Sequence, residues 1–179
     1  MQSLRDHSDI VTLIDLLRRR VQEPVDLGFR FLASRDGSVA ASLTFADLDR
    51  RARAVATVLA ERNAPGDRAL LCYSPGLEFM VGLYGALYAG LVAVPADPPR
   101  SHKPDPRLAS MASSCKPTIL LTSADHFADR ERLCAQMPEL AGIPWLASDA
   151  VPDLRADEWK PVPARGDDLA VLQYTSGST

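Results

Sequence analysis

Apolar positions along the chain follow two spacings, one typical of strands and one typical of helices. Continuous apolar runs predict buried strands at Ala69–Tyr73, Leu91–Pro95 and Thr118–Thr122. Helix-like patterns at Gly76–Gly90 and Arg107–Cys115 separate these runs. Because strand and helix patterns alternate, the sequence predicts an α/β fold, with a mostly parallel sheet flanked by helices.

The same patterns extend toward both ends of the chain. An amphipathic helix is predicted at Ile10–Val21. A hairpin is predicted from Phe29–Ala33 and Val39–Phe45, which flank an Asp-Gly turn dipeptide at 36–37. A last buried strand is predicted at Leu169–Tyr174.

Three further segments complete the pattern. Thr44 is predicted to cap the next helix, with Asp47 as an acidic variant of the capping box. A single helix is expected at Asp125–Gln136 and a short strand at Ile143–Leu146. Residues Val151–Arg165 are expected to form a surface loop before the last strand.

Residues 69–96 are apolar enough to raise the question of a membrane span. Ser74, Pro75 and Gly76 divide the stretch into a strand and a helix, each shorter than the roughly 20 residues that a bilayer requires. The helix has a face of small residues that includes Gly82 and Gly85, which predicts close packing on the sheet. We interpret the stretch as core, with no membrane span.

Composition indicates one soluble domain. The 179 residues are 46% hydrophobic and 24% charged, enough for a core and without the bias of disordered chains. A net charge of −3 gives no electrostatic footprint for nucleic acid or an anionic membrane. One basic cluster is interpreted as the C-terminus of a helix and consists of Arg18, Arg19 and Arg20. The other is interpreted as the solvent face of another helix and consists of Arg50, Arg51 and Arg53.

The cysteines favour a cytoplasmic location. Cys72, Cys115 and Cys134 are odd in number, widely separated and without a CxxC pair. This spacing suggests neither a disulfide framework nor a zinc site, so a reducing cytoplasm fits the chain best. We also predict no metal-ligating residues in the chain.

A group of small residues follows the last predicted strand, and its members are Thr175, Ser176, Gly177, Ser178 and Thr179. A strand that leads into small residues with hydroxyl and backbone N–H donors is typical of a site for phosphate oxygens. The alternative is a flexible Gly/Ser/Thr tail. The apolar run Leu169–Gln173 favours the phosphate site, because linkers are not preceded by a central-strand pattern.

Other chemistry-bearing residues are interpreted as structural. The histidines are isolated in sequence and are interpreted as surface or cap residues. The adjacent aspartates are interpreted as solvated loop charges, and the tryptophans as packing residues. These residues are His7, His102, His126, Asp167, Asp168, Trp145 and Trp159.

Several motifs resemble the acyl-adenylate-forming, or AMP-binding, superfamily, which includes acyl-CoA ligases and peptide-synthetase adenylation domains. Leu172–Thr179 resembles the opening of that superfamily's ATP-phosphate loop. Leu43–Leu48, Gly66–Leu71 and Pro75–Phe79 resemble its upstream strands and helices. The resemblance spans roughly residues 10–179.

Within the superfamily, the sequence looks most like the fatty acyl-AMP ligases. The residues that carry this likeness are Tyr88–Ala96, the proline pair Pro98 and Pro99, and Gln173. Asp97 departs from the pattern, since the resemblance leads us to expect an aromatic residue there.

The resemblance implies a ligase that uses ATP and Mg²⁺ to convert a fatty acid into an acyl-adenylate and pyrophosphate. The acyl group would then pass to the phosphopantetheine arm of an acyl carrier protein, in lipid or polyketide biosynthesis. Thr175, Ser176, Gly177, Ser178 and Thr179 would contact the ATP phosphates.

The superfamily's lysines and its adenine and ribose contacts match nothing in the 179 residues. We therefore expect residues 1–179 to be the N-terminal subdomain of an AMP-binding domain, truncated at the phosphate loop. By itself it would contain no catalytic residue and would be inactive, and it would have the remainder of its own adenylation domain as a partner.

Two alternatives stay open. The parent protein could be an acyl-CoA ligase, or an adenylation domain for an amino or aryl acid. In a different class, the chain could be a non-catalytic α/β module that binds a phosphorylated ligand or a protein.

Overall fold

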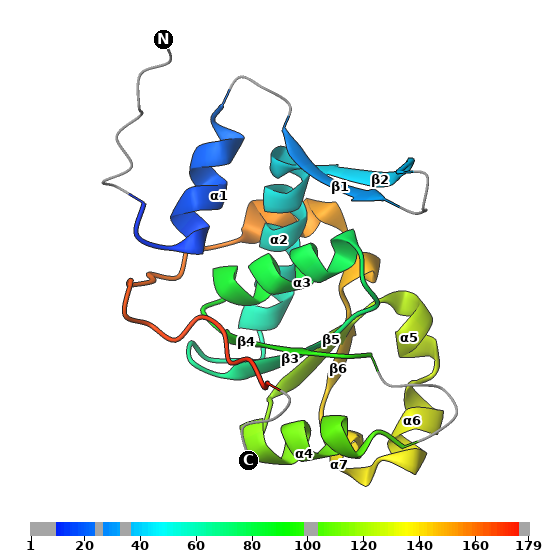
Figure 1. Cartoon of the computed structure of the whole chain (residues 1–179). Coiled ribbons are helices and arrows are strands. Elements are labelled where there is room, and N and C mark those ends of the chain that lie inside the picture. The colour runs from blue at the N-terminus through cyan, green and yellow to red at the C-terminus, as the bar shows by residue number, and fades with distance from the viewer. Residues whose placement is uncertain (1–9, 24–26, 33–36, 99–103, 176–179) are drawn as a thin grey trace.

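The computed structural model describes residues 10–23, 27–32, 37–98 and 104–175. Within these residues a parallel sheet forms from β3 (Arg68–Cys72), β4 (Val92–Ala96), β5 (Ile119–Thr122) and β6 (Trp145–Ala147). The strands lie in the order β4-β3-β5-β6 (Figure 1). The predicted α/β fold with a mostly parallel sheet is confirmed.

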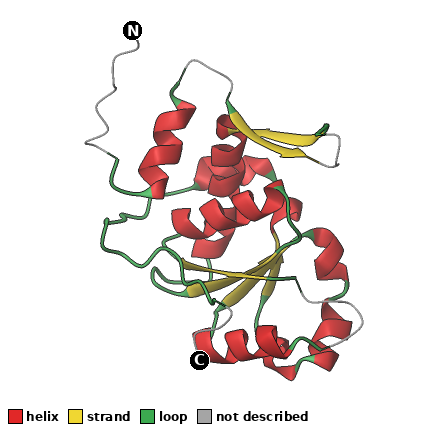
Figure 2. Ribbon diagram, viewed as in Figure 1, coloured by secondary structure: helices red, strands yellow, loops and turns green. Residues whose placement is uncertain are grey.

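Helices cover both faces of this sheet (Figure 2). One face is covered by α2 (Phe45–Ala60) and α3 (Leu77–Tyr88), with α1 (Leu13–Val21) packed beside them. The other face is covered by α4 (Pro106–Cys115), α6 (Arg130–Gln136) and α7 (Pro138–Ala141). The short helix α5 (Ala124–Ala128) follows β5.

The strand side chains alternate between two hydrophobic clusters. Leu71 and Leu121 are fully buried on the α2–α3 side, whereas Leu70 and Leu120 are fully buried on the α4 side. Successive residues of a strand point to opposite faces, so a strand buried on both faces must be apolar at every position. This explains why continuous apolar runs located the strands.

An antiparallel hairpin of β1 (Gly28–Leu32) and β2 (Val39–Thr44) forms a separate two-stranded sheet, as predicted. Of the predicted Asp-Gly turn dipeptide, Asp36 lies outside the described residues, and Gly37 has φ 74°. The rings of Phe29 and Phe45 meet edge to face at 5.5 Å between centroids, which fixes the hairpin against the start of α2.

Side-chain caps define where the first helices begin. Thr44 Oγ1 accepts a hydrogen bond of 3.0 Å from the Asp47 N–H at the start of α2, which confirms the predicted cap. The Asp47 carboxylate accepts from the Thr44 hydroxyl at 2.8 Å, so the prediction of a capping box at this helix is wrong. The sequence also holds a capping box that the predictions missed. Thr12 Oγ1 accepts from the Asp15 N–H at 3.1 Å, while the Thr12 N–H donates to Asp15 Oδ2 at 2.9 Å.

The prediction of one helix over Asp125–Gln136 is wrong, because α5 and α6 are separated at Asp129. Its backbone, at φ −87° and ψ 1°, leaves the helical region, and its N–H returns to the carbonyls of His126 and Phe127. Aspartate favours such breaks because its carboxylate competes with the backbone for hydrogen bonds.

The expected surface loop Val151–Arg165 is also more ordered than predicted. It contains the 3₁₀ helix η2 (Asp153–Glu158), which follows a shorter one, η1 (Ser148–Ala150). The segment docks on α2, where the Thr57 hydroxyl donates to the Arg155 carbonyl at 3.0 Å. The indole of Trp159 then stacks on Tyr88 with 4.9 Å between centroids, so this tryptophan packs within the fold.

The small-residue face of α3 permits close contact with two neighbouring parts of the fold. A Cβ added at Gly82 would lie 2.4 Å from the Tyr73 hydroxyl, just beyond the sheet, as the predicted sheet packing requires. A Cβ at Gly85 would instead lie 2.6 Å from Cγ1 of Val55, a residue of α2. The missing side chain at Gly85 therefore permits close approach of two helices.

The interpretation of the second arginine cluster as a solvent face is wrong for Arg51 and Arg53, which are partly buried. Arg51 Nη2 donates to both carboxylate oxygens of Glu78 at 2.8 and 2.7 Å, which joins α2 to α3. The first cluster does lie in the last turn of α1, as predicted.

Candidate functional site

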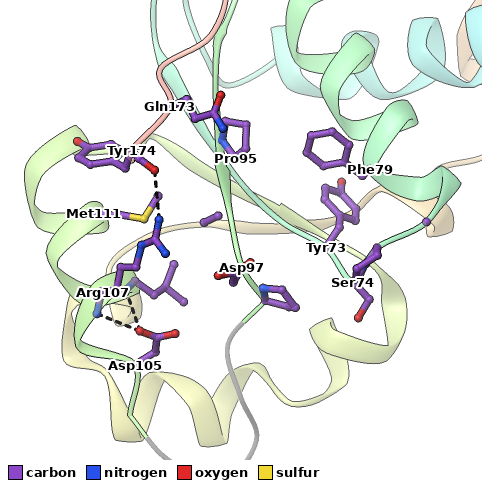
Figure 3. Close-up of a pocket in the computed structure, with 15 residues that line it drawn as sticks. Tyr73, Ser74, Phe79, Pro95, Asp97, Asp105, Arg107, Met111, Gln173 and Tyr174 are labelled. Carbon is purple, nitrogen blue, oxygen red and sulfur yellow. Dashed lines mark hydrogen bonds between the residues drawn. The ribbon is translucent and has the colours of Figure 1, made fainter. Parts of the chain in front are cut away.

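A cavity of about 330 Å³ opens at the carboxyl ends of β3 and β4 (Figure 3). Ser74 follows β3 and Asp97 follows β4, and both line the cavity. Ligands of open parallel sheets bind beyond the carboxyl ends of the strands. The remaining described lining residues come from the loop between β3 and α3, from α3, from β4 and the loop after it, from α4 and its cap, and from residues 173–174; they are Tyr73, Pro75, Gly76, Phe79, Pro95, Ala96, Pro98, Asp105, Arg107, Leu108, Met111, Gln173 and Tyr174.

The segment that leads to the small-residue group lies beside β4. The Ala93 N–H donates to the Ala170 carbonyl, and the Leu172 N–H donates to the Ala93 carbonyl, each at 2.9 Å. This parallel bridge between Ala93 and Val171 directs the following residues along β4 toward its carboxyl end. Thr175 therefore lies next to the cavity that Gln173 and Tyr174 line.

The predicted buried strand at Leu169–Tyr174 is nevertheless wrong in its extent. The structure has a single bridge there, and Leu169 is 58% exposed. A central strand needs a neighbour on each edge, and the described residues supply only β4.

Helix α4 fixes the end of this segment. Arg107 donates from Nη2 to the Tyr174 carbonyl at 3.2 Å, and the Tyr174 hydroxyl donates to Ser114 Oγ at 2.9 Å. Asp105 caps the same helix by accepting from the N–H groups of Arg107 and Leu108 at 2.9 and 3.2 Å. Sequence reasoning assigned none of these residues to the site, because nothing in their spacing reveals the contact.

The cavity wall combines charges of both signs. Among the described lining residues, Arg107 carries the positive side chain, while Asp97 and Asp105 carry negative ones. Asp97, where the resemblance led us to expect an aromatic residue, therefore contributes charge to the cavity rather than a ring.

The buried groups next to the cavity stay neutral. Burial raises the pKa of the Tyr73 phenol, whose hydroxyl donates to Ser148 Oγ at 2.8 Å. Burial also raises the pKa of the Cys72 thiol, which is fully buried. Neither group can therefore serve as a base or a thiolate nucleophile at neutral pH.

One histidine reaches the cavity wall, which sequence reasoning did not foresee. His126 Nε2 lies 3.0 Å from Ser74 Oγ, so α5 contacts the loop that follows β3. His7 and His102, also interpreted as structural, lie outside the described residues.

The predicted phosphate group falls largely outside the described residues. Thr175 is described and exposed, whereas Ser176, Gly177, Ser178 and Thr179 are not described. Their contact with ATP phosphates stays a prediction.

The remaining structural interpretations fit the contacts observed. Asp168 Oδ2 accepts from the Arg165 N–H at 2.7 Å and so closes a local turn. Trp145 is 8% exposed within the hydrophobic cluster on the α4 side. The three cysteines are free thiols.

Two further properties concern the described residues alone. They contain no group of three or more His, Cys, Asp or Glu side chains that could hold a metal ion. No helix among them combines the length and apolar character needed to cross a bilayer.

Comparison with known proteins identifies the family to which the chain belongs. The family model described as AMP-binding enzyme matches residues 29–179. The chain belongs to this family. The match covers the hairpin, the parallel sheet and the small-residue group, so the resemblance to AMP-binding enzymes is confirmed.

Individual AMP-binding relatives are fatty-acid ligases. The chain is 37% identical over 173 residues to the medium-chain-fatty-acid–(acyl-carrier-protein) ligase JamA of Moorena producens, covering 94% of this chain and 29% of that protein. It is 37% identical over 157 residues to the long-chain-fatty-acid–AMP ligase FadD32 of Mycolicibacterium smegmatis, covering 86% of this chain and 25% of that protein. The chain therefore spans less than a third of the length of these relatives.

A solved structure of a fatty-acid ligase is also similar to this chain. The fatty acyl-adenylate ligase from L. pneumophila, in complex with acyl adenylate and pyrophosphate, superposes with a TM-score of 0.82 at 34% identity. The superposition covers 96% of this chain and 29% of that one.

Proposed function

We propose that the protein to which this chain belongs activates a fatty acid with ATP and transfers the acyl group to an acyl carrier protein, in lipid or polyketide biosynthesis. The observation that carries the proposal is the AMP-binding family match over residues 29–179. Relatives named as fatty-acid–AMP and fatty-acid–carrier-protein ligases support the choice of substrate and acceptor.

In the first step, a carboxylate oxygen of the fatty acid attacks the α-phosphorus of ATP. The bond between the α-phosphorus and the bridging oxygen breaks, and pyrophosphate leaves with the electron pair. In the second step, the phosphopantetheine thiol attacks the acyl carbon, its proton is released, and AMP leaves. Such chemistry depends on holding the reactants in line and stabilising charge on the phosphate oxygens.

The role of this chain is to hold the polyphosphate. Thr175, Ser176, Ser178 and Thr179 donate hydroxyl or backbone N–H groups, and Gly177 permits close approach of the backbone to the phosphate. A hydrogen bond to a charged group contributes about 1.5–3 kcal/mol, so each donor is worth roughly tenfold or more in binding.

Mg²⁺ does not fit the described part of the chain, because that part has no cluster of side chains able to ligate a metal. Mg²⁺ at nucleotide sites is held by the substrate phosphates together with one or two carboxylates, so the ATP phosphates and carboxylates elsewhere in the protein would hold the ion. The adenine contacts and catalytic groups likewise belong to the remainder of the adenylation domain, since the relatives are more than three times as long as the matched region.

A reducing cytoplasm suits the three free thiols.

The test measures acyl-AMP by mass spectrometry and pyrophosphate release in parallel. The natural protein that carries these residues, given ATP, Mg²⁺ and fatty acids of graded length, is expected to form both products in equal amounts. The 179-residue chain by itself is expected to form neither. Product from amino or aryl acids alone would contradict the fatty-acid assignment, and absence of any adenylate would favour a binding module.

The acceptor is tested by adding coenzyme A or holo carrier protein to the same reaction. Thioester on the carrier protein is expected, and thioester on coenzyme A alone would favour the acyl-CoA ligase.

The phosphate role is tested by Thr175→Ala, which is expected to weaken ATP binding about tenfold to a hundredfold. Thr118→Ala is the matched control, because Thr118 is exposed at the amino end of β5 and donates to Asn63 Oδ1. Equal binding by both variants would remove Thr175 from the site.

A further inference from the structure

The segment that leads into the small-residue group is weakly held by the sheet. Its ladder with β4 ends at the Leu172 N–H, and Gln173 is exposed. A backbone held at one bridge frays readily, because few contacts oppose its opening. Something other than the sheet must therefore fix the direction in which the chain enters Thr175.

Tyr174 contacts α4 at two points. Its carbonyl accepts from Arg107 Nη2 at 3.2 Å and its hydroxyl donates to Ser114 Oγ at 2.9 Å (Figure 3 shows the Arg107 contact). Arg107 and Ser114 are two helical turns apart on one face of α4, which corresponds to about 10 Å along the axis. Tyr174 thus contacts α4 at two positions along the helix, which restrains both the position and the direction of its backbone.

Helix α4 is a firm support for this contact. Leu108, Met111 and Cys115 are each at most 5% exposed in the hydrophobic cluster on the α4 side, and the Tyr174 ring packs against the same cluster. Asp105 caps the first turn. The outward side chains Arg107 and Ser114 are therefore carried by a helix whose other face is anchored in the core.

We propose that Arg107 and Ser114 are positioning residues that orient the phosphate loop by holding Tyr174, the residue immediately before it. The proposal rests on the proposed function of residues 175–179. Neither residue needs to touch a substrate. A loop that must present several donors to a polyphosphate is effective only when its backbone is held in place before the reactants arrive.

The first test measures backbone order in the 179-residue chain itself and needs no activity. NMR order parameters of the Tyr174 and Thr175 amides are compared in the wild type, Arg107→Met and Ser114→Ala. Both variants are expected to lower the order parameters at 174 and 175, while the amides of β4 stay unchanged. Ser113→Ala, at the neighbouring exposed position of α4, is the matched control and is expected to leave all of them unchanged.

The second test measures kinetics in the natural protein that carries these residues. Arg107→Met is expected to lower kcat for acyl-AMP formation about tenfold to a hundredfold and Ser114→Ala about threefold to tenfold, with little change in the KM for the fatty acid. Arg107→Lys, which keeps a charged donor, is expected to recover part of the loss. The effects of Tyr174→Phe and Ser114→Ala are expected to be non-additive, because both remove the same hydrogen bond.

The outcomes separate this proposal from the proposed function. Unchanged order parameters at 174 and 175 in both α4 variants would overturn the positioning role, whatever the reaction. Loss of order in a protein that forms no acyl-adenylate would support the contact and reject the function. A fall in kcat equal to that of Ser113→Ala, or a rise confined to KM, would also overturn the positioning role.

Discussion

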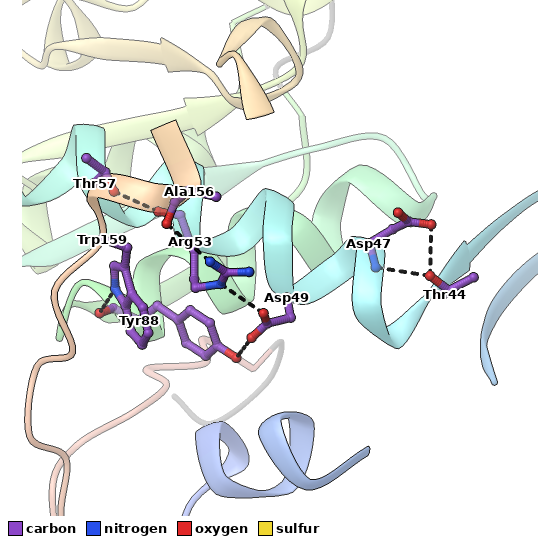
Figure 4. A network of polar contacts seen from close by, with 8 residues as sticks. All are labelled: Thr44, Asp47, Asp49, Arg53, Thr57, Tyr88, Ala156 and Trp159. Carbon is purple, nitrogen blue, oxygen red and sulfur yellow. Dashed lines mark hydrogen bonds and ion pairs between the residues drawn. The ribbon is translucent and has the colours of Figure 1, made fainter. Parts of the chain in front are cut away.

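The Tyr88 hydroxyl donates a hydrogen bond of 2.7 Å to Oδ1 of Asp49, a residue whose side chain is only 13% exposed (Figure 4). Arg53 Nε donates to the other carboxylate oxygen at 2.9 Å, and Arg53 Nη1 reaches the Ala156 carbonyl at 3.2 Å. The contacts join α3, α2 and η2 through one buried charge. A buried carboxylate is stable only when its hydrogen-bond partners are in place.

Replacing Tyr88 with phenylalanine is therefore expected to lower the free energy of unfolding by about 1–3 kcal/mol, since Asp49 is left with one unsatisfied oxygen. Urea unfolding at pH 7 measures the change. Tyr84→Phe, one turn earlier in α3, is the matched control and is expected to cost less. Equal losses in the two variants would show that the Tyr88 hydroxyl is not the stabilising group.

Gly85→Ala is expected to destabilise the protein by about 1–3 kcal/mol, because the added Cβ would lie 2.6 Å from Val55 Cγ1. The higher helix propensity of alanine, worth about 1 kcal/mol, offsets only part of this overlap. Thermal and urea unfolding measure the change. Gly142→Ala is the control, because no atom lies within 4 Å of its added Cβ, and it is expected to be neutral or slightly stabilising.

A double-mutant cycle with Val55→Ala tests the cause. Removing Cγ1 relieves the shortest contact, although Val55 Cβ would remain at 2.9 Å. The double variant is therefore expected to lose less than the sum of the two single losses. Additive losses would indicate that α2 and α3 do not meet at these residues.

The sequence predicted most of the fold because the decisive information was local. Strands buried on both faces require unbroken apolar runs such as Ala69–Tyr73, and a helix start such as Thr44 with Asp47 needs only neighbouring residues. The prediction for Leu169–Tyr174 was wrong in extent because a strand depends on partners at both edges, which its own residues do not reveal.

The site was predictable only in outline. Parallel topology alone predicts that Thr175 lies near the carboxyl ends of the strands. The contact of Arg107 with Tyr174 joins residues 67 positions apart and depends on which helix packs beside the terminal segment. The contact of His126 with Ser74 joins residues 52 positions apart and depends on where α5 packs relative to the loop after β3. No spacing rule connects such pairs.

Alkaline pH is expected to destabilise the protein through its buried thiol. Burial raises the pKa of Cys72 above its ordinary value of 9.0, so the folded protein retains a proton that the unfolded chain releases. The stability due to this group is present below pH 9 and is lost as the pH rises beyond it. Cys72→Ala is expected to make the fall in unfolding free energy shallower by up to about 1.4 kcal/mol per pH unit.

Urea unfolding between pH 7 and 10.5 measures these slopes. Val94→Ala is the matched control, because Val94 is fully buried in the same cluster but has no titrating group. Its stability is expected to be lower at every pH, with the wild-type slope. A wild-type slope in Cys72→Ala would contradict the assignment to the thiol.

Lys116→Gly is expected to stabilise the protein by about 0.5–1 kcal/mol, because Lys116 ends α4 in the left-handed region at φ 47° and ψ 63°. Its N–H closes the helix by donating to the Ala112 carbonyl at 3.0 Å, and glycine keeps that bond without the Cβ penalty. The greater flexibility of glycine in the unfolded chain reduces the gain but does not cancel it. Urea unfolding compares this variant with Lys116→Ala, which removes the charge and retains the Cβ. A gain in both variants would assign the effect to the lysine charge, whereas a gain confined to glycine assigns it to the backbone conformation that ends the helix.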